Sequence, residues 1–236
     1  MKHDAITVRP ADARGLADFG WLKSRHSFSF GEYHDPAHMG FKTLRVINED
    51  HIAGGGGFPT HPHRDMEIFS YVLEGALAHK DSMGNERVLK PGQIQLMSAG
   101  RGVTHSEYNP NPSALTHMLQ IWILPRERGL TPSYTEWLPQ PAHATTAKVL
   151  VISPDGRDGS AIIHQDAEVY RLILHNGQAV SHALRQGRGL WLQVMRGNLT
   201  FNGIPLNTGD GASLDQPGSA EIRAGADAEA LLFDLI

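Results

Sequence analysis

The chain of 236 residues contains no cysteine. This absence excludes disulfide bonds, thiolate metal sites, thiol redox chemistry and cysteine nucleophiles. No stretch approaches the roughly 18 apolar residues that a membrane helix needs, and the N-terminal segment lacks the apolar core of a secretory signal. The net charge of −4 provides no overall basic field. We therefore expect a cytoplasmic protein that binds neither nucleic acid directly nor a membrane.

Helical periodicity is also scarce, whereas the 25 glycines and 14 prolines supply many turn signals. Only residues 10–23 predict a short helix, with a ragged apolar face. Most of the remaining chain consists of short β-prone runs separated by turns roughly every 8–12 residues, a pattern typical of β-sandwiches and barrels. The hydrophobic fraction of 40% is sufficient for a core. The chain is thus predicted to be all-β.

The two halves of the chain resemble each other weakly. Val72–Gly75 and Val194–Gly197 both read as a strand that ends in a glycine turn, which suggests two copies of one β-barrel design. Between the halves lies a proline-rich stretch with few sustained apolar runs. We therefore predict an N-terminal barrel over residues 1–130, a linker over 131–147 and a C-terminal barrel over 148–236.

Histidine is abundant, with 14 residues, and two pairs of metal-ligating residue types stand out by their setting. Chance alone predicts about 0.8 His-x-His pairs, so His61 and His63 count only because they follow the glycine run 54–57 and enter a β-prone segment. His105 and Glu107 lie two apart in another such segment. Since residues two apart in a strand share a face, two antiparallel strands would direct all four groups to one point.

Imidazole and carboxylate donors suit a divalent transition metal with open coordination positions. We expect one such ion, with Fe(II) first and Ni(II), Mn(II), Co(II), Cu(II) or Zn(II) as alternatives that the donor types do not exclude. The alternative hypothesis is that these four residues are surface side chains beside turns and bind no metal. Glu67 lies an even number of residues from His61 and His63, so in one continuous strand it would share their face. We expect it to hydrogen-bond a ligand imidazole, with direct ligation as the alternative.

These clusters resemble the two sequence motifs of cupins. The first motif is carried by Gly55, His61, His63 and Glu67, and the second by Gly102, His105 and Asn109. More specifically, the chain resembles pirin-family bicupins close to bacterial pirin-like quercetin 2,3-dioxygenases. The matching stretches are His26–Asp50, Thr60–Gly75, His79–Asn85, Met97–Asn109 and Ser153–Tyr170.

The resemblance implies two cupin barrels in tandem, each a double-stranded β-helix of the jelly-roll type, with metal in the first barrel alone. It assigns His61, His63, His105 and Glu107 as the metal ligands. In the second barrel the corresponding positions are expected near His182, Leu184, Ile222 and Ala224, three of which are not ligand types. The C-terminal barrel is therefore expected to be degenerate and without metal.

The resemblance further implies a quercetin 2,3-dioxygenase-like oxidoreductase of flavonoid degradation. Such an enzyme uses a metal and dioxygen to cleave the C2–C3 bond of a flavonol such as quercetin, and it releases carbon monoxide. The metal would bind the deprotonated 3-hydroxyl of the flavonol. Glu107, or Glu67 behind it, would accept that proton, and the choice between the two stays open. No residue is assigned to substrate binding.

Two other functions remain alternatives. The barrel could belong to a metal-bearing regulatory protein with incidental quercetinase activity, as eukaryotic pirins are described as transcription cofactors. Another cupin activity on an oxygenated ring, isomerase or hydrolytic, is the third hypothesis. No basic tail or heptad repeat indicates a protein partner, so that partner stays open, and we expect a monomer.

Overall fold

The computed structural model describes residues 6–236, whose contacts divide the chain into two compact units. The N-terminal unit consists of residues 15–139 with 161–165. The C-terminal unit consists of residues 140–160 and 166–236, together with residues 6–14. Among the described residues, no helix is long and apolar enough to cross a membrane.

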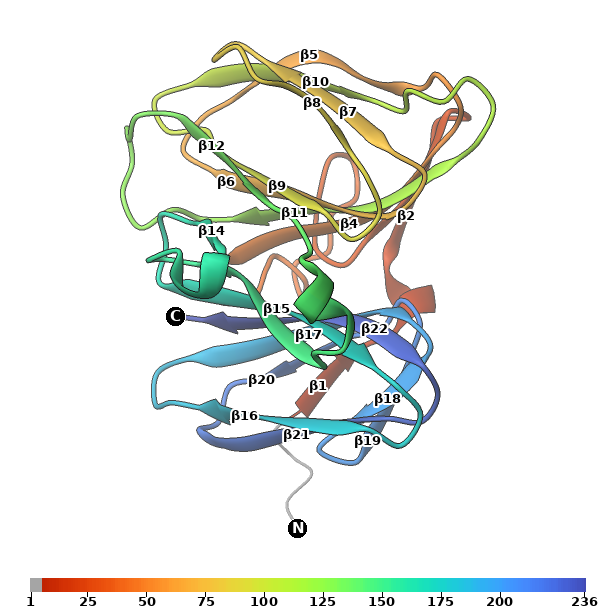
Figure 1. Cartoon of the computed structure of the whole chain (residues 1–236), viewed down its shortest axis with the longest axis vertical. Helices are drawn as coiled ribbons and strands as arrows, with labels where there is room; N and C mark the ends of the chain where they lie inside the picture. Colours follow the sequence, from red (N-terminus) through yellow and green to blue (C-terminus); the bar gives the residue numbers. More distant parts are fainter. Residues whose placement is uncertain (1–5) are drawn as a thin grey trace. The chain divides into compact units, whose positions relative to one another are not determined.

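The N-terminal unit is built from two antiparallel sheets that lie face to face (Figure 1). Its larger sheet has the strand order β12-β9-β6-β11-β4-β3-β2, and its smaller sheet has the order β5-β10-β7-β8. The larger sheet comprises β2 (Gly15–Asp18), β3 (Leu22–His26), β4 (Leu44–Ile52), β6 (Glu67–Glu74), β9 (Ile94–Ser98), β11 (Thr116–Ile123) and β12 (Ser133–Trp137). The smaller sheet comprises β5 (Gly57–His63), β7 (Leu77–Asp81), β8 (Glu86–Leu89) and β10 (Val103–Tyr108).

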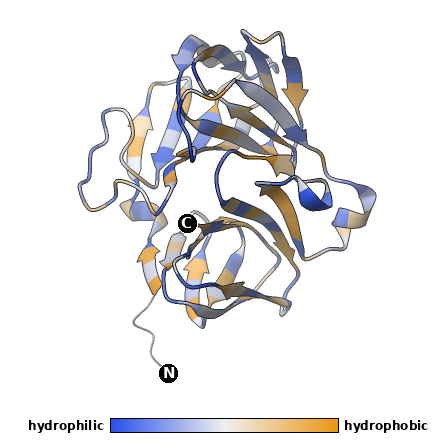
Figure 2. Cartoon of the chain, turned by 90° about the vertical axis from the view of Figure 1, so that its left-hand side faces the viewer, coloured by the Kyte–Doolittle hydropathy of each residue, from blue (hydrophilic) through white to orange (hydrophobic). Residues whose placement is uncertain are grey.

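The interior of this barrel is apolar at two places and polar between them. Hydrophilic and hydrophobic residues alternate along many strands (Figure 2), as expected for sheets with one face inside a barrel. One apolar cluster gathers around Val72 and Met118, and another around Ile68 and Met97. Between these clusters runs a row of paired polar residues across the larger sheet, made of Gln95, Ser70, Gln120, Asn48 and His26. The functional groups described below face this row.

The C-terminal unit repeats the two-sheet design. One sheet has the order β1-β20-β17-β22-β15-β13, and the other has the order β16-β21-β18-β19 (Figure 1). Its strands are β1 (Ile6–Arg9), β13 (Lys148–Ser153), β15 (Ala167–Leu174), β16 (Ala179–Leu184), β17 (Gly189–Arg196), β18 (Asn198–Phe201), β19 (Ile204–Asn207), β20 (Gly211–Leu214), β21 (Gly218–Ala224) and β22 (Ala228–Leu235). Three 3₁₀ turns and a two-residue strand complete the elements, namely η1 (Ala11–Ala13), η2 (Pro141–Ala144), η3 (Arg157–Gly159) and β14 (Ala161–Ile162).

The prediction of two all-β barrels on one chain is confirmed, but the predicted helix over residues 10–23 is wrong. Only η1 is helical there, and β2 and β3 follow it. A methyl group at Gly15 would meet the ring of Tyr33 at 2.3 Å, and Gly20 has φ +81°, so these glycines serve close packing and a strand turn. Part of the apolar face that was predicted for this helix lies in the paired strands β2 and β3 instead.

Two strand pairings involve segments near the predicted domain boundaries. β12, inside the stretch predicted as a linker, pairs with β9 of the N-terminal barrel. β1, at the start of the chain, pairs with β20 of the C-terminal unit. Both pairings join segments far apart in the sequence, which composition alone does not reveal.

Candidate metal centre

Strands β5 and β10 carry the two histidine-bearing segments and run antiparallel. His61 is paired with His105, so these two imidazoles project from neighbouring positions. Further along, Phe58 is paired with Glu107, so β5 has one residue more than β10 between the two pairs. Pro59 lies in this β-bulge, where the missing backbone N–H of proline removes no ladder hydrogen bond.

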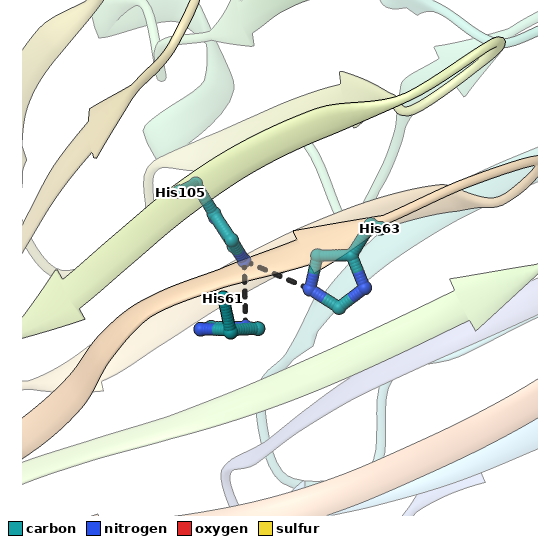
Figure 3. A group of neighbouring side chains, drawn as sticks. All are labelled: His61, His63 and His105. Carbon is teal, nitrogen blue, oxygen red and sulfur yellow. Dashed lines mark hydrogen bonds between the residues drawn. The ribbon is translucent and has the colours of Figure 1, made fainter.

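Three imidazoles converge between these strands (Figure 3). The Nε2 atom of His105 lies 3.0 Å from Nε2 of His63 and 3.1 Å from Nε2 of His61. For metal–nitrogen bonds of about 2.1 Å, two ligands at right angles lie about 3.0 Å apart, and two tetrahedral ligands about 3.4 Å apart. The two separations from His105 therefore match the spacing of neighbouring ligands of one divalent metal ion.

The Nδ1 atoms of His61 and His105, on the far side of each ring from the cluster, also have partners. Nδ1 of His61 donates to the carbonyl oxygen of Pro59 over 2.7 Å, which leaves Nε2 as the lone-pair nitrogen of the neutral ring. Nδ1 of His105 lies 3.5 Å from Nδ1 of His79. The ring of His79 is in turn fixed by Asp81, 3.1 Å from its Nε2. His79 is thus a positioning residue behind His105, and the sequence analysis missed it.

Burial favours the neutral form of His63 and His105, the form that binds metal. Desolvation, followed by the neighbouring rings of His105 and His61, lowers the pKa of His63 to about 4. Desolvation, followed by His61 and His79, lowers the pKa of His105 to about 3. For Asp81, burial opposes ionisation, but hydrogen bonds from Asn85, His79 and Met83 outweigh it and lower the pKa. An ionised Asp81 can then orient His79.

Glu107 is fully buried, and its carboxylate is held from the opposite sheet. Oε1 accepts hydrogen bonds of 3.0 Å from both Ser70 and Gln95, and Oε2 accepts one of 2.6 Å from Gln120. Ligand atoms of Glu107, His105 and His79 lie within 4.8 Å of one another, and those of His61, His63 and His105 form a second group of the same size. The two groups share His105, which connects Glu107 to the imidazole cluster.

Glu67 lies elsewhere than expected. Its Oε1 accepts a hydrogen bond of 2.6 Å from Ser98, and its Oε2 accepts one of 3.2 Å from the backbone N–H of His164. These partners replace the expected bond to a ligand imidazole. The physical reason is the turn after β5, where Asp65 adopts φ +50°. Because β6 starts after this turn and belongs to the other sheet, the alternation of side-chain faces along β5 does not continue to Glu67.

A cavity of about 740 Å³ opens beside the imidazole cluster, within the size range of small-molecule sites. His61 and His63 lie in its wall, so the Nε2 cluster has access to whatever the cavity holds. The ring of Trp122 lies at its edge, 5.0 Å from the ring of His63. Much of the lining is aromatic, contributed by Phe19, Phe30, Tyr33, Phe58 and Trp122.

The strand register identifies the equivalent positions in the C-terminal barrel. His182 is paired with Ala220, as His61 is paired with His105, and Ile222 is paired with Phe201, as Glu107 is paired with His79. The second pair of equivalents is therefore Ala220 and Ile222, two residues earlier than the sequence analysis placed it. His182 is the one ligand-type residue among the four positions, and the absence of metal there stays a prediction.

His182 is instead part of a buried charged network. Its Nδ1 lies 2.8 Å from the ammonium of Lys148, and its Nε2 lies 2.7 Å from Asp234, which also binds Arg188. Desolvation lowers the pKa of Lys148, opposed by Asp234 and Glu168. Burial opposes ionisation of Asp234, but hydrogen bonds from His182 and Arg188 lower its pKa.

Two jelly-roll barrels on one chain, one of them with converging imidazoles and an adjoining cavity, define a tandem cupin of the metal-binding type. Comparison with known proteins narrows this class. The Pirin family profile matches residues 8–123, and the profile of the quercetinase C-terminal cupin domain matches residues 150–235. The chain belongs to the pirin family.

Individual relatives cover nearly the whole chain. It is 49% identical to the quercetin 2,3-dioxygenase of Escherichia coli (strain K12), with 98% of both chains aligned, and 42% identical to a pirin-like protein of Caulobacter vibrioides, with 97% of this chain and 99% of the relative aligned. The crystal structure of YhhW from Escherichia coli superposes with a TM-score of 0.95 at 49% identity, over 98% of this chain and 97% of that one. The crystal structure of bacterial pirin YhhW in complex with nickel(II) gives a TM-score of 0.93 at 48% identity, over 98% of both chains.

These findings confirm the predicted pirin-family tandem cupin and the predicted enzyme class, a quercetin 2,3-dioxygenase-like oxidoreductase. They bear on the chain as a whole. The individual ligand residues and the domain boundaries remain assignments made from this chain's own sequence and geometry.

Proposed function

We propose that the protein is a metal-dependent dioxygenase that cleaves the C2–C3 bond of a flavonol such as quercetin. Quercetin and dioxygen would yield a depside and carbon monoxide, with both atoms of dioxygen retained in the depside. The observation that carries the proposal is the convergence of three imidazole Nε2 atoms beside an aromatic-lined cavity of about 740 Å³. Similarity to the Escherichia coli quercetin 2,3-dioxygenase supports this choice of substrate.

We assign His61, His63 and His105 as metal ligands and Glu107 as the fourth. The three imidazoles are spaced as neighbouring ligands of one ion, and Glu107 lies beside His105 on the same strand. A divalent transition metal fits this donor set, and the Escherichia coli relative forms a complex with nickel(II). Fe(II) stays our first prediction. When bound, such an ion supplies Lewis acidity at the 3-hydroxyl of the flavonol.

Glu107 is the residue that we assign to accept the proton of the 3-hydroxyl. Its ligand atom lies within 4.8 Å of that of His105, and three hydrogen bonds from Ser70, Gln95 and Gln120 hold it in place. Glu67 does not suit this role, because its carboxylate is held by Ser98 and by the backbone of His164. A buried, fixed carboxylate provides a proton acceptor without solvent reorganisation.

The first test pairs His61→Ala with His175→Ala. We expect His61→Ala protein to lose its bound metal and at least 100-fold in quercetin turnover, because a ligand of the cluster is missing. His175→Ala removes an imidazole whose side chain is 73% exposed, and it should retain both metal and turnover. Elemental analysis and oxygen uptake on quercetin, with detection of carbon monoxide, provide the measurements. Full turnover by a metal-free His61→Ala protein would contradict the mechanism.

A second pair of variants distinguishes the two carboxylates. Glu107→Gln should lower kcat at least 100-fold, whereas Glu67→Gln should leave kcat within a few-fold of the unaltered protein. The reverse result would assign the proton acceptor to Glu67. If the unaltered protein with its metal turns over quercetin with kcat/KM far below about 10⁴ M⁻¹s⁻¹, the regulatory alternative becomes the better interpretation.

A further inference from the structure

A buried carboxyl group that is not part of the imidazole cluster also lines the cavity. Asp50, on β4, is 2% exposed, and the described residues supply it with one hydrogen bond, from the hydroxyl of Ser24 to Oδ1 over 2.5 Å. Both residues belong to the cavity wall. A buried carboxyl group has several acceptor positions, and leaving most of them without donors is costly. The pair is therefore suited to accept a hydrogen bond from a molecule in the cavity.

A second polar pair lies next to the first on the same strands. Ser24 is paired with Asp50, and two residues further His26 is paired with Asn48. Nδ1 of His26 lies 2.7 Å from Oδ1 of Asn48, and both residues also line the cavity. The two pairs form a short polar strip on a wall that also carries the aromatic rings of Phe30 and Trp122. We call these four residues the polar strip.

A chain of rings connects the imidazole cluster to the polar strip. The ring of His63 lies 5.0 Å from that of Trp122, Trp122 lies 5.3 Å from Phe30, and Phe30 lies 5.5 Å from His26. Two of these contacts are edge-to-face, at 86° and 89°. Since such rings pack well against flat aromatic molecules, the wall favours a planar occupant that extends from the cluster to the strip.

We propose that the polar strip, with Asp50 as the acceptor, binds a hydroxyl of the pendant phenyl ring of the flavonol and so selects substrates hydroxylated on that ring. This inference rests on the proposed function, which places the 3-hydroxyl end of the molecule at the imidazole cluster. A phenolic hydroxyl donates well to a carboxylate, and an analogue without the hydroxyl leaves the buried carboxyl unpaired. Asp50 is a specificity-determining residue in this scheme and not a proton acceptor of the reaction.

The test compares two flavonols under nitrogen, so that binding is measured without turnover. Quercetin carries two hydroxyls on the pendant ring, and galangin carries none. We expect the metal-containing protein to bind quercetin at least tenfold more tightly than galangin, as measured by quenching of tryptophan fluorescence. In Asp50→Asn the amide oxygen can keep the hydrogen bond from Ser24, and the NH2 group, a donor, takes the place of the second carboxyl oxygen. The preference should then fall to less than about threefold, mainly through weaker binding of quercetin.

Two further variants make the comparison decisive. Ser24→Ala removes the donor that fixes Asp50 and should reduce the preference in the same direction, so it decides the matter if Asp50→Asn protein does not fold. Asp18→Asn removes another carboxylate of the cavity, whose side chain is 49% exposed and pairs with Lys23. It should change the affinities for both flavonols by a common factor and leave their ratio unchanged.

The outcomes separate this inference from the proposed function. Binding of both flavonols with equal affinity, or a preference that survives in both Asp50→Asn and Ser24→Ala, would overturn the role of the polar strip and leave the dioxygenase proposal intact. An equal loss of preference in Asp18→Asn would also overturn it, because charge and not position would then be responsible. No binding of either flavonol by metal-containing protein would overturn the proposed function, and this inference with it.

Discussion

Burial acts on single side chains of the N-terminal barrel in opposite directions, according to the charge of their ionised forms. It disfavours the protonated imidazole, and the pKa values of His63 and His105 fall to about 4 and about 3. It disfavours the ionised carboxyl, and desolvation raises the pKa of Asp50 to about 7, assisted by Glu107 and Glu49 and opposed by Ser24 and His117. Burial in the same barrel thus favours the neutral, metal-binding form of His63 and His105 and makes Asp50 harder to ionise.

The raised pKa of Asp50 predicts a pH dependence of stability. In the unfolded chain this carboxyl titrates near pH 3.8, so between about pH 4 and pH 7 the folded state binds more protons, and stability falls as pH rises through this window. Asp50→Asn removes this contribution. We expect the unaltered protein to lose roughly 2–4 kcal/mol relative to the variant between pH 4 and pH 8. Urea unfolding of metal-free protein at both pH values measures the difference, and parallel pH profiles would contradict the prediction.

Residue spacing predicted the three imidazoles well, because residues two apart in a strand share a face regardless of the fold around them. It did not reveal that Glu67 bonds to Ser98 and to the backbone of His164, because the positive φ of Asp65 ends the alternation of faces before β6 begins. His79 was missed for another reason. It lies two residues from Asp81 in β7, but only the pairing of β7 with β10 brings it behind His105.

At the scale of elements, the approach of β5 to β10 depends on Gly57. A methyl group at this position would lie 2.4 Å from the carbonyl oxygen of Glu107 and 2.6 Å from Cα of Tyr108. Backbone atoms cannot rotate away from such a contact, so the strands would have to separate. The sequence predicted the strands themselves but not this contact, because it does not reveal which strand packs against a given glycine.

Gly57→Ala should therefore destabilise the protein by about 2–3 kcal/mol or more and lower its metal content, because β5 and β10 carry all three imidazoles. Gly55→Ala is the matched control. Its φ of +70° costs about 1–2 kcal/mol for a residue with a side chain, but the added methyl group meets nothing within 4 Å. Urea unfolding and elemental analysis of both variants provide the test. Equal metal contents in the two variants would show that the close strand approach is not required.

Across the whole molecule, two barrels of one design hold different groups at equivalent positions. His61 lies in a cluster of three imidazoles beside a cavity, whereas its equivalent His182 lies between Lys148 and Asp234. The tandem arrangement was predictable because glycine turns repeat in both halves. The pairing of β1 with β20 and the exact register of β21 were not, because both depend on contacts between distant segments.

This difference between the barrels predicts opposite effects for two matched histidine variants. His61 is partly exposed and lies among ligands, so His61→Ala should abolish metal binding and leave the thermal midpoint of metal-free protein nearly unchanged. His182 is 8% exposed, and His182→Ala leaves Lys148 and Asp234 without their shared partner. We expect that variant to retain one metal ion per chain but to lose roughly 2–4 kcal/mol of stability, or about 4–12 °C in thermal midpoint. Elemental analysis and calorimetry of metal-free and metal-loaded samples measure both quantities. Loss of metal in His182→Ala with retention in His61→Ala would place the metal in the C-terminal barrel, and two ions per chain in the unaltered protein would show that both barrels bind metal.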